Sequence, residues 1–140
     1  PLDLQKSLSI TYLDNKKEKI SKGWFLVKDD NKQEFMFSGN SLVRVYCRSL
    51  VDNADSHYTI KVYENNQWLG NYTFDFEQSD KSAKISTNYN NLKGELLSKN
   101  RSFYLSVPNI EGVDYSHYTF IVPNDDNLLI RIVEYETSDK

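Results

Sequence analysis

The two histidines are the residues whose type and placement first suggest chemistry. His57 and His117 occupy the same position in two copies of one tetrapeptide, Ser-His-Tyr-Thr, at Ser56–Thr59 and Ser116–Thr119. Imidazole is the side chain most often found as a metal ligand in proteins. A repeated histidine therefore raises the question of a metal site.

A metal site would need further ligands beside the histidines. Three or four side chains must converge on one ion, and the nearest preceding acidic residues are Asp55 and Asp114. This short spacing is common in sequences, and the tetrapeptide is also typical of the entry into a β-strand. We therefore predict that both histidines point outward or lie at a sheet rim, and that the protein holds no metal and no cofactor.

The residues around each tetrapeptide predict the elements that carry it. Apolar and polar residues alternate at matching offsets before both copies. The apolar positions are Val43, Val45 and Cys47 in the first unit and Phe103, Leu105 and Val107 in the second. Alternation with a period of two places successive side chains on opposite faces of a strand. The pattern indicates one strand–loop–strand unit used twice, with Tyr58 and Tyr118 pointing inward.

The same alternation runs through most of the chain, and no segment keeps a helical period. We predict an all-β fold, a single β-sandwich domain over residues 1–140 with about eight to ten short antiparallel strands. A jelly-roll-like arrangement is favoured, with an immunoglobulin-like topology as the alternative. Asn65-Asn66 is predicted to form a hairpin turn, and the polar stretch 78–100 is expected to be mainly loop. The polar tail from about residue 136 is expected to be frayed.

Composition and charge argue against several classes of protein. The net charge of −3 argues against nucleic-acid binding, which needs a basic surface. No apolar run approaches the roughly 20 residues of a membrane span, so no transmembrane segment is expected. The single cysteine, Cys47, excludes an internal disulfide and is expected to be a small buried hydrophobe. The chain begins at Pro1, which suggests a mature form or an excised domain, and a periplasmic or extracellular location is favoured.

No motif of a known catalytic chemistry is present. The Gly-x-Ser-x-Gly elbow of serine hydrolases is absent, and glycine is scarce at five residues. A Ser–His–Asp set or a pair of carboxylates for glycoside hydrolysis stays open, because separation in space is not visible in sequence. The candidate carboxylates are typical of solvated strand faces or rims: Glu34, Glu64, Asp75 and Glu77. We predict that the protein is not an enzyme and has no catalytic residue.

Clusters of Asp and Asn between predicted strands raise the question of calcium. They fall at 29–31, 52–55 and 124–127, and Ca²⁺ prefers six to eight oxygen ligands. The segment Leu42–Val62 is loosely similar to the opening of C2 domains, which implies calcium-dependent membrane binding as an alternative. It departs from that family in having Ser56-His57 where C2 domains have Asp-Pro, and no paired Asp-x-Asp loop follows.

Aromatic residues form the remaining candidate site. Several fall at positions that the alternation marks as outward, or in loops: Trp24, Trp68, Tyr46, Tyr63, Tyr104 and Tyr115. A row of exposed rings on a sheet can stack on the C–H faces of a glycan, and Tyr and Trp are also enriched in protein interfaces. Rings that fill a second packed layer are the structural alternative.

We therefore predict a non-catalytic β-sandwich module that binds a glycan or a protein partner in the cell envelope or outside the cell. The alternative is a structural or assembly domain that makes protein–protein contacts without a discrete ligand. The candidate binding residues are Trp24, Trp68, Tyr104, Tyr115, His57 and His117. The sequence leaves the oligomeric state open.

Overall fold

The computed structural model describes residues 7–50, 57–77, 83–89, 91–123 and 127–136, and these residues form ten strands. Six strands form one sheet, in the order β7-β1-β2-β10-β4-β8, and four form a second, in the order β3-β9-β5-β6. The strands of the larger sheet are β7 (Lys84–Ile85), β1 (Leu8–Asp14), β2 (Lys17–Val27), β10 (Leu128–Glu136), β4 (Ser41–Ser49) and β8 (Arg101–Ser106). The strands of the smaller sheet are β3 (Gln33–Ser38), β9 (Tyr115–Ile121), β5 (His57–Glu64) and β6 (Gln67–Asp75).

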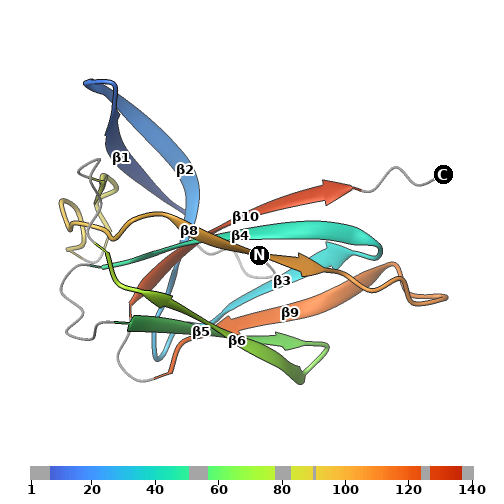
Figure 1. Cartoon of the computed structure of the whole chain (residues 1–140). Coiled ribbons are helices and arrows are strands. Elements are labelled where there is room, and N and C mark those ends of the chain that lie inside the picture. Colours follow the sequence, from blue (N-terminus) through green and yellow to red (C-terminus); the bar gives the residue numbers. More distant parts are fainter. Residues whose placement is uncertain (1–6, 51–56, 78–82, 90, 124–126, 137–140) are drawn as a thin grey trace.

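The strand order is that of a jelly roll. Every pairing is antiparallel, and the chain crosses between the sheets from β2 to β3, back from β3 to β4, from β4 to β5, from β6 to β7, and on both sides of β9. Because of these crossings, strands from early and late parts of the chain lie next to each other in both sheets, as in the two Greek keys of a jelly roll. The strands β1 and β7 extend the larger sheet beyond this eight-strand set, and the β1–β2 hairpin projects past the two layers (Figure 1). The all-β fold and the jelly-roll-like sandwich are thus confirmed.

The main hydrophobic core lies between the two sheets. Both sheets contribute alternate side chains to it, among them Val43, Val45 and Cys47 from β4 and Tyr58, Ile60 and Val62 from β5. The predicted inward positions of both repeat units are confirmed, because Tyr58 and Tyr118 are at most 1% exposed. At one side Tyr72 of β6 stacks on Phe103 of β8, with ring centroids 3.8 Å apart.

A second core covers the opposite face of the larger sheet. Its buried residues include Leu8, Ile10, Trp24, Leu26 and Leu129 from the strands and Ala83, Ile85 and Leu97 from the segment 83–98. This segment was expected to be mainly loop, and it does contain only the two-residue strand β7 and isolated bridges. Its few apolar residues nevertheless bury a patch of sheet that alternation alone marks as outward.

Trp24 is the residue most affected by this second layer. It was expected to be exposed, but only 2% of its surface is accessible, so that expectation was wrong. Its indole nitrogen donates a hydrogen bond to Ser21 Oγ at 3.0 Å, and the guanidinium of Arg48 lies 5.7 Å from its ring. Trp24 therefore belongs to the structural core and is no longer a candidate for ligand binding.

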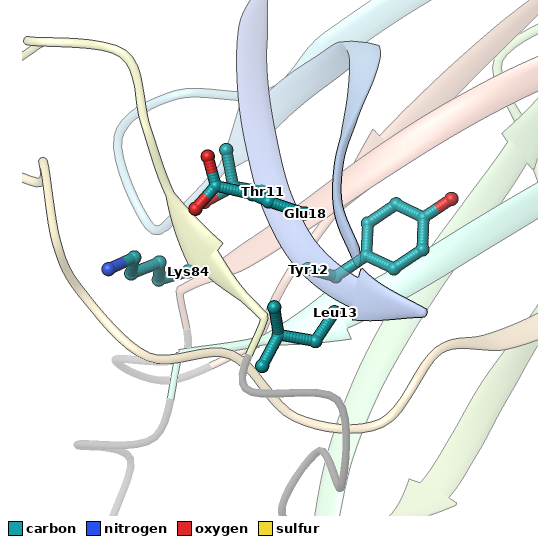
Figure 2. Close-up of a pocket in the computed structure, with 5 residues that line it drawn as sticks. All are labelled: Thr11, Tyr12, Leu13, Glu18 and Lys84. Atoms are coloured by element: carbon teal, nitrogen blue, oxygen red, sulfur yellow. The ribbon is translucent and has the colours of Figure 1, made fainter. Parts of the chain in front are cut away.

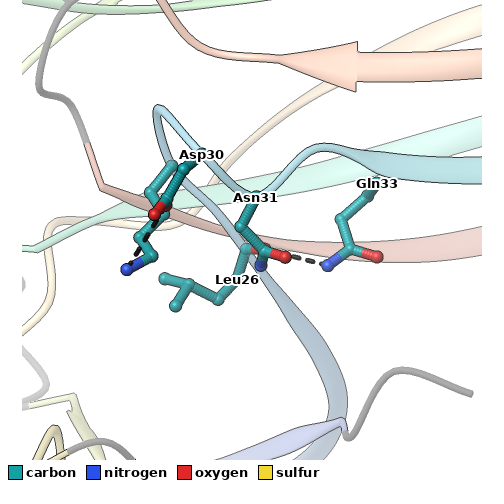
Figure 3. Close-up of polar contacts among 5 residues, drawn as sticks. Leu26, Asp30, Asn31 and Gln33 are labelled. Carbon is teal, nitrogen blue, oxygen red and sulfur yellow. Dashed lines mark hydrogen bonds and ion pairs between the residues drawn. The ribbon is translucent and has the colours of Figure 1, made fainter.

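The corner between β2 and β3 is held by side chains that bond to one backbone carbonyl. The amide nitrogens of Asn31 and Gln33 donate to the carbonyl oxygen of Leu26, at 2.8 and 2.9 Å (Figure 3). Lys28 and Asp30 form an ion pair at 3.5 Å across the same turn. These contacts fix where β3 enters the smaller sheet, and so where the outward side chains at the start of β3 lie.

No helix that could cross a bilayer occurs among the residues that the structure describes. The tail that was expected to be frayed begins where β10 ends at Glu136, and residues 137–140 lie outside the described part of the chain.

Candidate functional site

The outer face of the smaller sheet carries a row of functional side chains, one from each strand. Glu34 of β3 is opposite Thr119 of β9, Thr119 is opposite Tyr63 of β5, and Tyr63 is opposite Trp68 of β6. Side chains directly opposite each other on adjacent strands lie about 5 Å apart. The row therefore places a carboxylate, a hydroxyl and two aromatic rings next to one another.

A β-bulge at Leu69 places Trp68 in this row. Tyr63 pairs with Trp68 whereas Val62 pairs with Gly70, so β6 has one extra residue between the two pairs. Without the bulge, Trp68 would share the inward face of Tyr72 and Phe74. With it, the indole is 60% exposed, and its nitrogen donates to Asn71 Oδ1 at 2.9 Å. Bulges are over-represented where a side chain is re-aimed at a functional site.

A shallow hollow of about 340 Å³ lies beside this row. Its lining residues come from three strands and two turns: Lys32, Glu34, Tyr63, Asn66, Thr119 and Ile121. The volume is at the lower end of the range for small-molecule sites. The lining combines an ammonium, a carboxylate, an amide and a hydroxyl with a phenol ring, so it offers both hydrogen bonding and a flat apolar surface.

The β5–β6 turn holds one wall of the hollow in place. Asn65 and Asn66 both have positive φ, at 49° and 68°, which is the geometry of a two-residue type I′ hairpin turn and confirms the predicted turn. Asn65 also extends the ladder to β9, because its backbone N–H donates to the His117 carbonyl at 2.7 Å and its Oδ1 accepts from the His117 N–H at 2.9 Å. Asn66 therefore lies in a turn that two hydrogen bonds of Asn65 hold against β9.

His117 lies at the edge of this site and contacts it directly. Its Nε2 is 3.1 Å from Glu34 Oε1, and both side chains are only about a quarter exposed, at 23% and 26%. The histidine thus fixes the position of the one carboxylate that lines the hollow. Protonation of His117 would turn this hydrogen bond into an ion pair.

His57 has a different environment in spite of its identical tetrapeptide. It pairs with Asp75 of β6 at 3.1 Å, and its side chain is 59% exposed. Because Glu64 is opposite Tyr118, the 8-residue length of β5 separates the two histidines, a distance of roughly 25 Å. They therefore do not share a site, and the part of the chain with described coordinates contains no cluster of three His, Cys, Asp or Glu side chains that could hold a metal.

The carboxylate that contacts His117 is Glu34 and not the predicted helper Asp114. Asp55 lies outside the described residues, as do most of the acidic loops 52–55 and 124–127, whereas the loop at 29–31 uses Asp30 for its ion pair with Lys28. Among the described residues, the carboxylates that pair with the histidines are Glu34 and Asp75, which come from neighbouring strands. Sequence reasoning named both as carboxylates but had no means of pairing them with the histidines, because register between distant strands is not visible in the chain.

The other predicted aromatic residues divide between the two sheets. Tyr115 is 54% exposed and lies on the same outer face as the hollow, two rows further along β9 and opposite Ser38. Tyr104 is 51% exposed but lies on the larger sheet. Sequence analysis did not select Lys32, Asn66 and Thr119, and only strand pairing brings them together.

A second, smaller hollow of about 150 Å³ lies at the edge of the larger sheet. Figure 2 shows Thr11, Leu13, Glu18 and Lys84 around it, with the Tyr12 ring pointing away from Lys84. Tyr12 is the one aromatic residue among the described residues that line it, and its volume is below that of typical ligand sites. We therefore take the hollow on the smaller sheet as the candidate site.

Titratable groups with strongly shifted pKa values lie in the core and not at this site. Burial raises the pKa of the Cys47 thiol well above its ordinary range, so the thiol stays protonated. Burial likewise raises the pKa of Tyr58, and burial together with the hydrogen bond to Glu64 raises that of Tyr118. The prediction that Cys47 is a small buried hydrophobe is confirmed, because the residue is 0% exposed.

Comparisons with known proteins add no assignment. No family model matches the chain, and neither the curated proteins nor the solved structures give a significant match. Any statement of function therefore depends on the geometry of the site.

Proposed function

We propose that the chain is a non-catalytic carbohydrate-binding module that holds a glycan on the outer face of the β3-β9-β5-β6 sheet. The observation that carries this proposal is the cross-strand row Glu34–Thr119–Tyr63–Trp68 beside the hollow. Sugars have apolar C–H faces and polar rims. A site with two rings and several hydrogen-bonding groups in one row matches both features.

The polar groups of the site favour binding over hydrolysis. Glycoside hydrolysis in most enzyme families needs two carboxyl groups on either side of the scissile bond. Among the described residues that line the hollow, Glu34 is the one carboxylate, and His117 holds it at 3.1 Å. A carboxylate fixed in this way is suited to accepting hydrogen bonds from sugar hydroxyls. Such a module would act in the cell envelope or outside the cell, where glycans are exposed.

The proposal is tested with a glycan array followed by isothermal titration with the best ligand. Trp68→Ala and Tyr63→Ala are each expected to lower the affinity at least about tenfold, because each removes a ring from the row. Tyr104→Ala is the matched control, since Tyr104 is similarly exposed but lies on the other sheet. Equal losses from Tyr104→Ala and Trp68→Ala, or no glycan bound by the unmodified protein, would refute the proposed site.

An assembly domain remains the second candidate, because the β1–β2 hairpin exposes apolar side chains. Leu13 of β1 and Ile20 of β2 are 44% and 61% exposed. Exposed apolar residues on a projecting element are typical of contacts between proteins. Self-association in sedimentation velocity that disappears in Ile20→Ser would favour this candidate over the glycan module.

A further inference from the structure

The outer face of the larger sheet carries an arginine–tyrosine face, which we define as Arg44, Tyr46, Tyr104 and Arg131. Tyr46 is opposite Arg131, and Tyr104 is opposite Arg44. The second core buries the neighbouring Trp24 and Leu26, and Tyr46 packs against its margin. Tyr104 is 51% exposed, and the other three side chains are half-buried.

The tyrosine rings hold the two guanidinium groups in place. The Cζ of Arg44 lies 4.5 Å from the centroid of Tyr46 and 5.2 Å from that of Tyr104, so this guanidinium rests between two rings. The Cζ of Arg131 lies 5.8 Å from the Tyr46 ring. Because the rings restrict both side chains, little further rotamer freedom is lost when a ligand binds.

The Nη atoms of both guanidinium groups form no hydrogen bond with the described residues. The Nε of Arg44 donates to Ser102 Oγ at 3.0 Å, and the Nε of Arg131 donates to the carbonyl of Lys22 at 3.1 Å. Neither arginine forms an ion pair with any residue in the described ranges. Guanidinium groups bind carboxylates in bidentate geometry, so two arginines without an ion-pair partner in the described part of the chain suit an acidic ligand.

The spacing of the arginines fits an extended acidic peptide. Arg131 shares a row with Tyr46, and Arg44 lies in the next row of the same face, two residues along β4. Rows of one face are separated by about 6.6 Å, which is also the spacing of alternate side chains in an extended peptide. The arginine–tyrosine face is therefore suited to a linear partner laid flat on the sheet.

We infer that the arginine–tyrosine face docks an extended acidic segment of a partner protein, with carboxylates at alternate positions contacting Arg44 and Arg131. Tyrosine and arginine are the residues most enriched at the centres of protein interfaces. The adjacent strand β8 is an edge strand of the larger sheet, so the peptide lies beside an unpaired strand edge. This surface is independent of the proposed glycan site, which lies on the other sheet.

The test uses fluorescence anisotropy with a labelled peptide of alternating Glu and Ser, and a second peptide in which Gln replaces Glu. Of the two peptides, we expect only the acidic one to bind, with an affinity that falls as the salt concentration is raised. Arg44→Gln and Arg131→Gln are each expected to weaken binding roughly fivefold to tenfold. Lys61→Gln removes the same charge from the other sheet and is expected to change the affinity less than twofold.

Three results would overturn the inference. They are no binding of the acidic peptide, equal losses from Lys61→Gln and Arg44→Gln, and tighter, arginine-dependent binding of polygalacturonate, which would identify an anionic polysaccharide as the ligand. Arg44→Lys is the control for a loss of folding, because it keeps the positive charge and removes only the planar guanidinium group. It is expected to bind more weakly than the unmodified protein and more tightly than Arg44→Gln.

Discussion

At the scale of single residues, the two copies of Ser-His-Tyr-Thr show how little a local sequence determines about its surroundings. The tyrosine of each copy is buried as the alternation predicts, yet each hydroxyl meets a different environment. Tyr118 donates to Glu64 Oε2 at 2.5 Å, whereas the Tyr58 hydroxyl has no hydrogen-bond partner among the described residues. Ser98 lies near the Tyr58 hydroxyl but does not form a hydrogen bond with it. The partners come from other strands, so the tetrapeptide itself carries no information about them.

This difference predicts opposite outcomes for the same substitution. Tyr118→Phe is expected to lower the free energy of unfolding by about 2 kcal/mol, because it removes a hydrogen bond to a charged group. Tyr58→Phe is expected to leave it unchanged or slightly higher, because it removes a buried hydroxyl without a partner. Urea denaturation of both variants measures the difference. Equal destabilisation by the two substitutions would contradict the hydrogen-bond assignment.

At the scale of elements, sequence reasoning found the strands and missed what covers them. The repeat units correspond to β4–β5 and β8–β9, and their inward faces were predicted residue by residue. Alternation identifies one buried face of a strand, so it fails where a second layer buries the other face. That layer is the segment 83–98, whose low overall hydrophobicity hides the few apolar residues that contact the sheet.

The candidate site was only partly predictable for a related reason. Trp68 and Tyr63 were identified as outward aromatic residues, but the bulge that aligns them is visible only in the pairing of β5 with β6. Glu34 and Thr119 join the row through the pairing of β3 with β9, which are far apart in the chain. Register between distant strands depends on the packed core, and a single sequence does not reveal it.

The covering segment provides a prediction with an adjacent control. Leu97 is 1% exposed in the second core, whereas Leu96 is 44% exposed. Leu97→Ala is expected to cost about 3 kcal/mol of unfolding free energy, because it leaves a cavity against the sheet. Leu96→Ala is expected to change it by less than about 0.5 kcal/mol. The midpoints of chemical denaturation give both values, and similar midpoints would show that the segment does not pack as described.

At the scale of the whole molecule, a buried thiol and two buried phenol groups make the stability depend on pH in the alkaline range. Burial raises the folded-state pKa of Cys47, and also those of Tyr58 and Tyr118. Above the ordinary pKa of a thiol, about 8.5, the unfolded chain loses this proton while the folded chain keeps it. The unfolded state then binds fewer protons, so stability falls as pH rises. The tyrosines add the same effect from about pH 10.

We expect the free energy of unfolding to fall between about pH 8.5 and 10 by up to about 1.4 kcal/mol per pH unit from Cys47 alone. Denaturant titrations at several pH values measure this slope. Cys47→Ala removes the thiol and is expected to flatten the curve in this interval, at the cost of a lower starting stability. An unchanged slope in Cys47→Ala would show that another group is responsible.

The position of β10 has a consequence for how the chain is made. The larger sheet places β10 between β2 and β4, so a strand at residues 128–136 joins two strands that precede residue 50. Until residues 128–136 leave the ribosome, β2 and β4 have no shared partner and their apolar faces stay accessible. The nascent chain must therefore remain soluble without a continuous larger sheet until residues 128–136 have been synthesised.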